Sequence, residues 1–400
     1  MTKKYLVLFS IILGSFKVAF AQMPASKIQP FSPLTGPYAV GTVQFEWTDL
    51  DHEEIFTSKV GDKRVVVAQI WYPANKTNTS PNAPYLLSPL EFSGVTKDAK
   101  RLQIANSLVQ TRSHINVPVA TAQSQYPILI YNPGGANTRF LSSFVTEQLA
   151  SHGFIVVAIE HYGNSMATHF PDGSPMNFDR PPVKHYPEDR PLPSPEQYEK
   201  EALESIKERD ENLMPIYLQD THFIISKIRE LHRTNNLFRG RFNFDKLGAL
   251  GWSFGGATSI QLLVNDRRFK AAANLDGQLS GVGKESMETH KPFLLLTSSP
   301  TEYSKDPMGK VMARLDKMTA RWTTWLLNYS TGPRYHSAVA GTDHGSFSDW
   351  NILLAFADWQ FKIPSKDTEA IEAARKKYEV QKNREQTISD LVVKFFLRHL

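Results

Sequence analysis

Leu247-Gly248-Ala249-Leu250-Gly251-Trp252-Ser253-Phe254-Gly255-Gly256 gives the strongest indication of the fold, because an apolar run passes through a glycine-flanked serine into a segment with helical character. Leu247 to Leu250 predicts a buried strand, and Gly256 to Val264 predicts a helix. A serine on a tight turn between a strand and a helix presents its hydroxyl clear of the sheet, and small neighbours relieve the crowding of that turn. Ser253 is therefore a candidate nucleophile.

Strand-like and helix-like segments alternate on both sides of this turn, which predicts an α/β fold with a largely parallel sheet covered by helices on both faces. The apolar runs of strand length are Val65 to Tyr72, Ile128 to Tyr131, Phe154 to Ile159, Leu247 to Leu250, Ala271 to Leu275, Phe293 to Thr297 and Tyr335 to Ala340. The helical stretches between several of them are Phe140 to His152, Gly256 to Val264, Met308 to Asn328 and Phe347 to Phe361.

Two further segments do not fit a simple alternation. Asn164 to Pro195 is rich in proline, and Ser194-Pro195-Glu196-Gln197 has the pattern of a helix start. We interpret residues 164–233 as a lid-like insertion that flanks the site. Asp367 to Leu400 is charged and then apolar at helical spacing, so we expect it to dock on the sheet.

The N-terminus has the pattern of a cleaved secretory signal, with Lys3 and Lys4 before a short apolar run and Ala19-Phe20-Ala21 at its end. We therefore expect a leader over residues 1–21, a single domain over residues 22–400, and a secreted or periplasmic protein without a membrane anchor. The chain has no cysteine, which excludes disulfides and a thiol nucleophile. Its net charge of +5 lacks a sustained basic stripe, so nucleic-acid binding is not indicated, although weak contact with lipid surfaces stays open.

A serine nucleophile needs a histidine base and an acid that orients the base, and in sheets of this type the chain order is serine, acid, histidine. The best acid is Asp276, because it stands at the carboxyl end of a predicted strand; its rivals are Asp343 and Asp349. The best base is His344, in the glycine-bounded loop Gly341 to Gly345. His290 precedes a predicted strand and His336 lies inside one, which makes both less suitable.

The negative charge that develops on an attacked carbonyl oxygen needs two N–H donors. One is expected from Phe254, which follows the nucleophile. The other is expected from the loop after Ile128 to Tyr131, where Gly134 is the preferred donor and Gly135 lies next to it. Pro133 has no N–H to donate. Trp252, Gly135 and His161 are candidates for lining the substrate pocket, and Glu160-His161 is also consistent with a structural role.

These residues resemble the platelet-activating factor acetylhydrolases of the plasma and isoform II type, a family of α/β-hydrolases. The resemblance is carried by five segments: Gly36 to Gly41, Leu149 to Val156 before Glu160-His161, Trp252 to Thr258, Arg267 to Asp276 and His344 to Asp349. It implies an α/β-hydrolase fold, Ser253 as nucleophile, Asp276 as acid, His344 as base, and the hydrolysis of short sn-2 acyl groups of phospholipids.

The chain departs from the family at two places, where it has Trp252 in place of histidine and Asn132-Pro133-Gly134-Gly135 in place of His-Gly-Leu-Gly. Small esters other than phospholipids therefore stay open as substrates, and a broader carboxylesterase, a dienelactone hydrolase or a polyester hydrolase is the alternative. A non-catalytic lipid-binding protein is a further alternative, which the intact Ser253, Asp276 and His344 argue against. We expect no cofactor and no metal, because the sequence has no HExxH motif or comparable cluster of metal ligands.

Overall fold

The computed structural model describes residues 30–75, 80–92, 109–180, 193–279, 288–359 and 367–400. The predicted leader, residues 1–21, lies outside the described residues. Four prolines of the proline-rich segment lie outside them as well: Pro181, Pro182, Pro187 and Pro191.

The described strands form one sheet in the order β10-β9-β8-β7-β5-β6-β2-β1-β4-β3. Neighbouring strands from β10 to β6 are parallel, while β2 is antiparallel to both β6 and β1. The predicted α/β class with a mostly parallel sheet is therefore confirmed. The strands are β1 (Ala39–Glu53), β2 (Lys63–Ala74), β3 (Asn82–Pro84), β4 (Gln110–Ile115), β5 (Tyr126–Asn132), β6 (Ile155–Glu160), β7 (Phe242–Trp252), β8 (Phe269–Leu275), β9 (Phe293–Thr297) and β10 (Arg334–Ala338).

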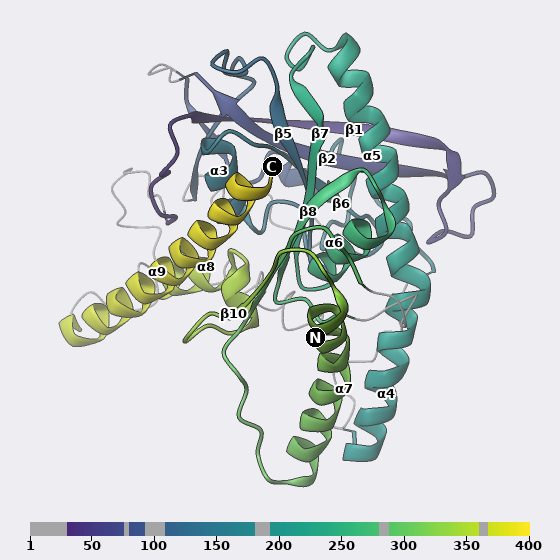
Figure 1. Cartoon of the computed structure of the whole chain (residues 1–400), viewed down its shortest axis with the longest axis vertical. Helices are drawn as coiled ribbons and strands as arrows, with labels where there is room; N and C mark the ends of the chain where they lie inside the picture. Colours follow the sequence, from purple (N-terminus) through teal and green to yellow (C-terminus); the bar gives the residue numbers. More distant parts are fainter. Residues whose placement is uncertain (1–29, 76–79, 93–108, 181–192, 280–287, 360–366) are drawn as a thin grey trace.

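Helices cover both faces of this sheet (Figure 1). Successive residues of a strand point to opposite faces, so in β5 Leu129 and Tyr131 enter one core while Ile128 and Ile130 enter the other. The first core is closed by α3 (Ser143–Ser151), α8 (Trp350–Ala357) and α9 (Thr368–His399), and the second by α5 (Met214–Thr234), α6 (Phe254–Asn265) and α7 (Pro307–Tyr329).

The segment over residues 164–233, predicted as one lid-like insertion, is divided between two structural roles. Its helix α4 (Pro195–Glu208) has no buried residue and continues through a π-helical turn, Arg209–Leu213, into α5. By contrast, α5 buries Ile224, Ile225 and Ile228 against the sheet, as the crossover helix between β6 and β7 must. Of the helices in this segment, only α4 stands away from the sheet, where it lies beside α7 (Figure 1).

The C-terminal helix α9 docks on the sheet as the sequence predicts. It lies across α3 and α8, shown in yellow in Figure 1. A methyl group built on Gly248 of β7 would come within 2.9 Å of Leu400 and 3.1 Å of Phe396, so the end of α9 rests directly on a central strand. Among the described residues, no helix has both the length and the apolar character that a membrane crossing requires.

Candidate active site

Ser253 occupies a strained turn between β7 and α6. Its φ of +55° lies in the region that side chains other than glycine rarely adopt. Two glycines make the turn feasible, since a methyl group on Gly255 would lie 1.9 Å from the Asn132 carbonyl oxygen and one on Gly251 would lie 2.4 Å from it. The Ser253 amide donates to Leu275 O at 2.9 Å, which ties the turn to β8. The close backbone contacts and this hydrogen bond fix the conformation of the turn.

One side chain that follows β10 contacts the Ser253 hydroxyl, and one that follows β8 contacts that side chain in turn. His344, the first residue of the short 3-10 helix His344–Phe347, places Nε2 3.0 Å from Ser253 Oγ. Its Nδ1 lies 2.7 Å from Asp276 Oδ2. Asp276 follows β8 with a φ of +55°, and its other oxygen, Oδ1, accepts from the Ser298 amide at 2.7 Å. The structure therefore brings Ser253, His344 and Asp276 into one chain of hydrogen bonds.

Trp252 contacts His344 through a hydrogen bond and through its ring. Its indole Nε1–H donates to the backbone oxygen of His344 at 2.9 Å, and the two ring centroids are 5.0 Å apart. The side chain is buried, so it contacts the histidine rather than an open surface.

The loop after β5 lies beside Ser253. A methyl group on Gly134 would come within 3.1 Å of the Ser253 Cβ and 2.9 Å of the Trp252 ring, so only glycine fits there. On the other side, Phe254 is the first residue of α6, and its amide has no acceptor within the helix. The structure thus places the backbone of Gly134 and that of Phe254 on either side of the serine, with Gly135 next to Phe254.

The rival acids are engaged elsewhere. Asp343 caps the 3-10 helix that begins at His344, because its Oδ1 accepts from the Ser346 amide at 3.0 Å. Asp349 is buried, and its Oδ2 accepts from the Tyr85 hydroxyl at 2.6 Å and the Ser143 amide at 3.0 Å. Burial raises the pKa of Asp349 to about 7. Of the candidate acids, Asp276 is therefore the one that the structure pairs with His344.

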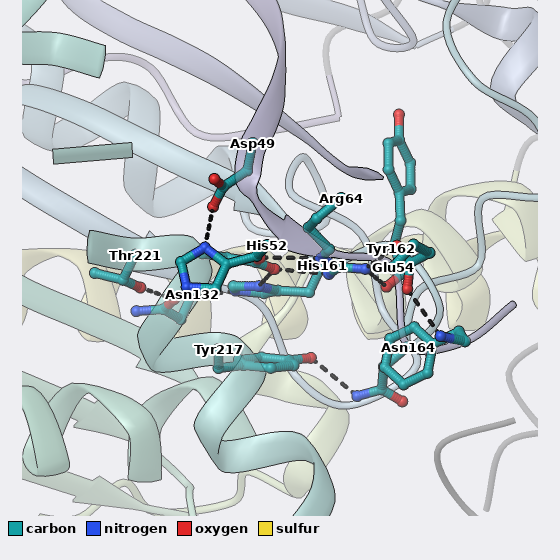
Figure 2. Close-up of polar contacts among 12 residues, drawn as sticks. Asp49, His52, Glu54, Arg64, Asn132, His161, Tyr162, Asn164, Tyr217 and Thr221 are labelled. Atoms are coloured by element: carbon teal, nitrogen blue, oxygen red, sulfur yellow. Dashed lines mark hydrogen bonds and ion pairs between the residues drawn. The ribbon is translucent and has the colours of Figure 1, made fainter. Parts of the chain in front are cut away.

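His161 lies next to Asn132, the last residue of β5 (Figure 2). Its side chain is 1% exposed. Its Nδ1 is 2.9 Å from Asp220 Oδ2 and its Nε2 is 3.1 Å from Asn132 Oδ1. Burial would raise the pKa of Asp220, but the charge of Arg64 and the hydrogen bonds to that carboxylate outweigh it and lower the pKa. Burial also lowers the pKa of His161, against the opposing effect of Asp220. The structure therefore places this pocket candidate in a buried polar cluster.

Sequence reasoning missed the partners of His161. Arg64 donates to both Asp220 oxygens, at 3.0 and 2.7 Å, and to Glu54 Oε2 at 2.8 Å. The sequence contains one signal for this cluster. Asp220 stands on the apolar face of α5, at helical spacing from Ile216, Tyr217 and Ile224. An acid at such a position needs a buried partner. In the parts of the chain that the structure describes, no group of three His, Asp or Glu side chains is arranged to hold a metal ion.

Comparison with known proteins agrees with this architecture. The family model of platelet-activating factor acetylhydrolase, isoform II, matches residues 23–374. The platelet-activating factor acetylhydrolase of Bos taurus is 28% identical over 309 residues, covering 72% of this chain and 67% of the relative. That of Cavia porcellus is 27% identical over 281 residues, covering 68% of this chain and 61% of the relative.

A solved structure shares the fold. The ferulic acid esterase from Streptomyces cinnamoneus superposes with a TM-score of 0.61 at 21% identity, covering 94% of each chain. At that identity the likeness concerns the fold alone. The match of the family model extends over most of the sequence, and the chain therefore belongs to the platelet-activating factor acetylhydrolase, isoform II, family.

Proposed function

We propose that this protein is a serine esterase that cleaves short acyl esters, with sn-2 acetyl or short-chain phospholipids as its substrate class. The observation that carries the proposal is the unbroken chain from Asp276 Oδ2 through His344 to Ser253 Oγ, with distances of 2.7 and 3.0 Å. Family membership supports the same reaction class.

In the first half of the reaction, Ser253 Oγ attacks the ester carbonyl while His344 Nε2 takes the hydroxyl proton. Asp276 accepts from Nδ1–H, which keeps the lone pair on Nε2 facing the serine and stabilises the imidazolium that forms. The negative charge on the carbonyl oxygen is held by the amides of Phe254 and Gly134 at the positive end of α6. The imidazolium then donates its proton to the leaving alcohol oxygen.

In the second half, a water molecule gives a proton to His344 and attacks the acyl-Ser253 ester. Collapse of this second tetrahedral intermediate releases the short carboxylic acid and returns the proton to Ser253 Oγ. His344 is 39% exposed in side chain, so water has access to the base. Every step uses side chains and backbone amides of this chain.

The test is hydrolysis of an sn-2 acetyl phospholipid and of p-nitrophenyl acetate, with Ser253→Ala as the blank for both. Cleavage of both substrates that depends on Ser253 supports the proposal in full. Cleavage of p-nitrophenyl acetate alone keeps the esterase and removes the phospholipid assignment, which favours a general esterase. Ser298→Ala is the matched control, because its backbone amide still reaches Asp276 while a serine hydroxyl near the site is lost. Equal rates for Ser253→Ala and the wild-type protein would overturn the proposal.

A further inference from the structure

A second carboxylate–imidazole pair, Asp220–His161, contacts the start of the loop that carries Gly134. His161 stands between Asp220, 2.9 Å from Nδ1, and the carboxamide of Asn132, 3.1 Å from Nε2. Figure 2 shows His161 next to Asn132. Asn132 is the last residue of β5 and leads into residues 133–135. Thr221, the residue after Asp220 on α5, reaches the same carboxamide through Oγ1 at 3.2 Å. The start of the loop is therefore fixed to α5 through a buried imidazole.

The end of the same loop is also connected to His161. The Ala136 amide donates to the backbone oxygen of Asn164 at 3.1 Å, and Asn164 Nδ2 donates to the Tyr217 hydroxyl at 3.0 Å. Tyr217 in turn stacks on His161, with ring centroids 3.6 Å apart and an interplanar angle of 19°. Figure 2 shows Tyr217 reaching toward Asn164. Both ends of the loop thus rest on one stacked pair of rings.

The other predicted oxyanion donor touches this pair as well. The ring of Phe254 packs edge-on against Tyr217, with centroids 4.9 Å apart. His161 and Tyr217 are both buried, and protein interiors at this density transmit small displacements to their neighbours. A shift of the His161–Tyr217 stack would therefore move Gly134 and Phe254 relative to each other.

Asp220, which contacts the His161–Tyr217 stack through His161, is held rigidly by charge and by hydrogen bonds. Arg64 binds both oxygens of Asp220, and it also donates to Glu54 Oε2 and to the Tyr162 carbonyl oxygen, each at 2.8 Å. The anionic Asp220 accepts from His161 Nδ1–H. In the structure, Asn132 Oδ1 faces both His161 Nε2 and Thr221 Oγ1, while Asn132 Nδ2 lacks a hydrogen-bond partner among the described residues. Rotating the carboxamide by 180° places its NH2 group there, where it donates to the Nε2 lone pair of the neutral ring and to Thr221 Oγ1.

We propose that His161, held by Asp220 and stacked on Tyr217, is a positioning residue that sets the separation of the two oxyanion donors, Gly134 and Phe254. The inference rests on the proposed esterase function. Donors of an oxyanion hole act on the charge that develops in the transition state, so a misplaced donor lowers kcat more than it raises KM. A positioning residue for both donors should therefore affect turnover and the binding of tetrahedral adducts together.

The first experiment compares His161→Asn with His161→Gln. The terminal group of glutamine occupies the place of Nε2 and keeps a contact to Asn132, whereas that of asparagine occupies the place of Nδ1 and loses it. We expect His161→Asn to lower kcat on p-nitrophenyl acetate by roughly 10- to 100-fold, with KM changed by no more than about twofold. The inhibition constant of a short aryl trifluoromethyl ketone, which forms a tetrahedral adduct on Ser253, should rise by a similar factor. His161→Gln should recover most of both losses.

The second experiment uses a variant that keeps the fold even if His161 variants do not. Tyr217→Phe keeps the ring but removes the acceptor for Asn164 Nδ2, and we expect a fall in kcat of about 3- to 10-fold. Tyr72→Phe is the matched control, because it also deletes one buried tyrosine hydroxyl, which donates to Val117 O at 2.8 Å. Tyr72 lies toward the amino ends of the parallel strands, away from the site at their carboxyl ends, since its neighbour Trp71 pairs with Val156 near the start of β6. The kcat of the Tyr72→Phe variant should equal that of the wild-type protein.

The outcomes separate this inference from the function on which it rests. A wild-type protein without Ser253-dependent turnover overturns the esterase proposal and the inference with it. An active wild-type protein whose His161→Asn and Tyr217→Phe variants keep kcat and ketone affinity overturns the inference alone. A fall in kcat without weaker ketone binding also overturns it, because the oxyanion donors would then be unaffected.

Discussion

Two carboxylate–imidazole pairs with nearly the same internal geometry occupy very different surroundings. In the pair Asp276–His344 the oxygen-to-Nδ1 distance is 2.7 Å and the side chains are 12% and 39% exposed. In the pair Asp220–His161 the distance is 2.9 Å and both side chains are 1% exposed. The first imidazole meets a serine hydroxyl and the second a carboxamide. The two pairs differ in the outer partner of the imidazole and in its access to water, and the proposed role of His344 as a base depends on these two features.

The largest expected effect comes from breaking the exposed pair. Asp276→Asn keeps the shape of the side chain but offers His344 an amide, which favours the wrong tautomer. We expect kcat on p-nitrophenyl acetate to fall by about 10⁴-fold with little change in stability. Steady-state kinetics and thermal unfolding check both parts. A loss of less than about tenfold would contradict the role of Asp276.

Removing the cation beside the buried pair Asp220–His161 should instead cause a large loss of stability. Arg64→Met leaves Asp220 and Glu54 buried without their cation, and we expect the free energy of unfolding to fall by about 3–5 kcal/mol. Urea denaturation measures this loss.

The control is Arg314→Met, because Arg314 also makes an Arg–carboxylate pair, with Glu199 of α4, but both side chains are exposed to solvent. The same substitution there should cost less than about 1 kcal/mol. Equal losses in the two variants would contradict the buried cluster.

Glu385 extends the contrast, because it is a buried acid that has no cationic partner among the described residues. Both oxygens of Glu385 on α9 lack a hydrogen-bond partner in the described part of the chain, and burial, followed by the charge of Asp349, raises the pKa of this carboxyl well above its ordinary value. The folded protein therefore holds this proton more tightly than the unfolded chain, so stability falls as pH rises above the unfolded value toward the folded one.

Glu385→Gln removes that dependence. Relative to the wild-type protein, the variant should gain stability by up to about 1.4 kcal/mol per pH unit over that window. Urea denaturation at about pH 5 and about pH 8 measures the gain, with the partly exposed Glu379→Gln on the same helix as control. A gain that does not grow with pH would contradict a raised pKa for Glu385.

The smallest effect concerns the support of His344. Trp252→Phe keeps an aromatic ring beside the imidazole but removes the donor to the His344 backbone oxygen. We expect kcat to fall by about three- to tenfold, in line with the loss of one hydrogen bond. Trp322→Phe, on α7 where the side chain packs partly buried against the second core, serves as the control and should leave kcat unchanged. An unchanged rate in both variants would show that Trp252 does not hold the histidine.

Much of the fold could be predicted because most of the parallel strands contain a continuous apolar stretch, such as Leu247 to Leu250 in β7. Strands β1, β3 and β4 lie outside the predicted segments, because β1 alternates polar with apolar residues, β3 has three residues and β4 is mostly polar. Gln110–Ile115 is a strand because its backbone pairs with β1 and its Ser113 is buried against Glu147 of α3. Such pairing depends on segments distant in the sequence, so local pattern does not reveal it.

The positions of Ser253, Asp276 and His344 follow strand ends and a glycine-bounded loop, which is why the sequence indicated them; their catalytic roles stay proposals. The cluster of Arg64, Asp220 and Tyr217 could not be assembled in this way. Its members come from β2 and α5, and only the tertiary arrangement joins them to His161.

The π-helical turn Arg209–Leu213 has a consequence for how α4 is oriented. Residues 195–234 form one continuous helical rod in which this wider turn replaces an ordinary one. A π-helical turn holds one residue more than an α-helical turn, so deleting one residue from it would leave an ordinary α-turn and change the azimuth of α4 little. The side of α4 that bears Glu199 would then still face Arg314. The wide turn thus accommodates one additional residue between the part of the rod that supports Tyr217 and the part that contacts α7, while the angular phase between them is kept.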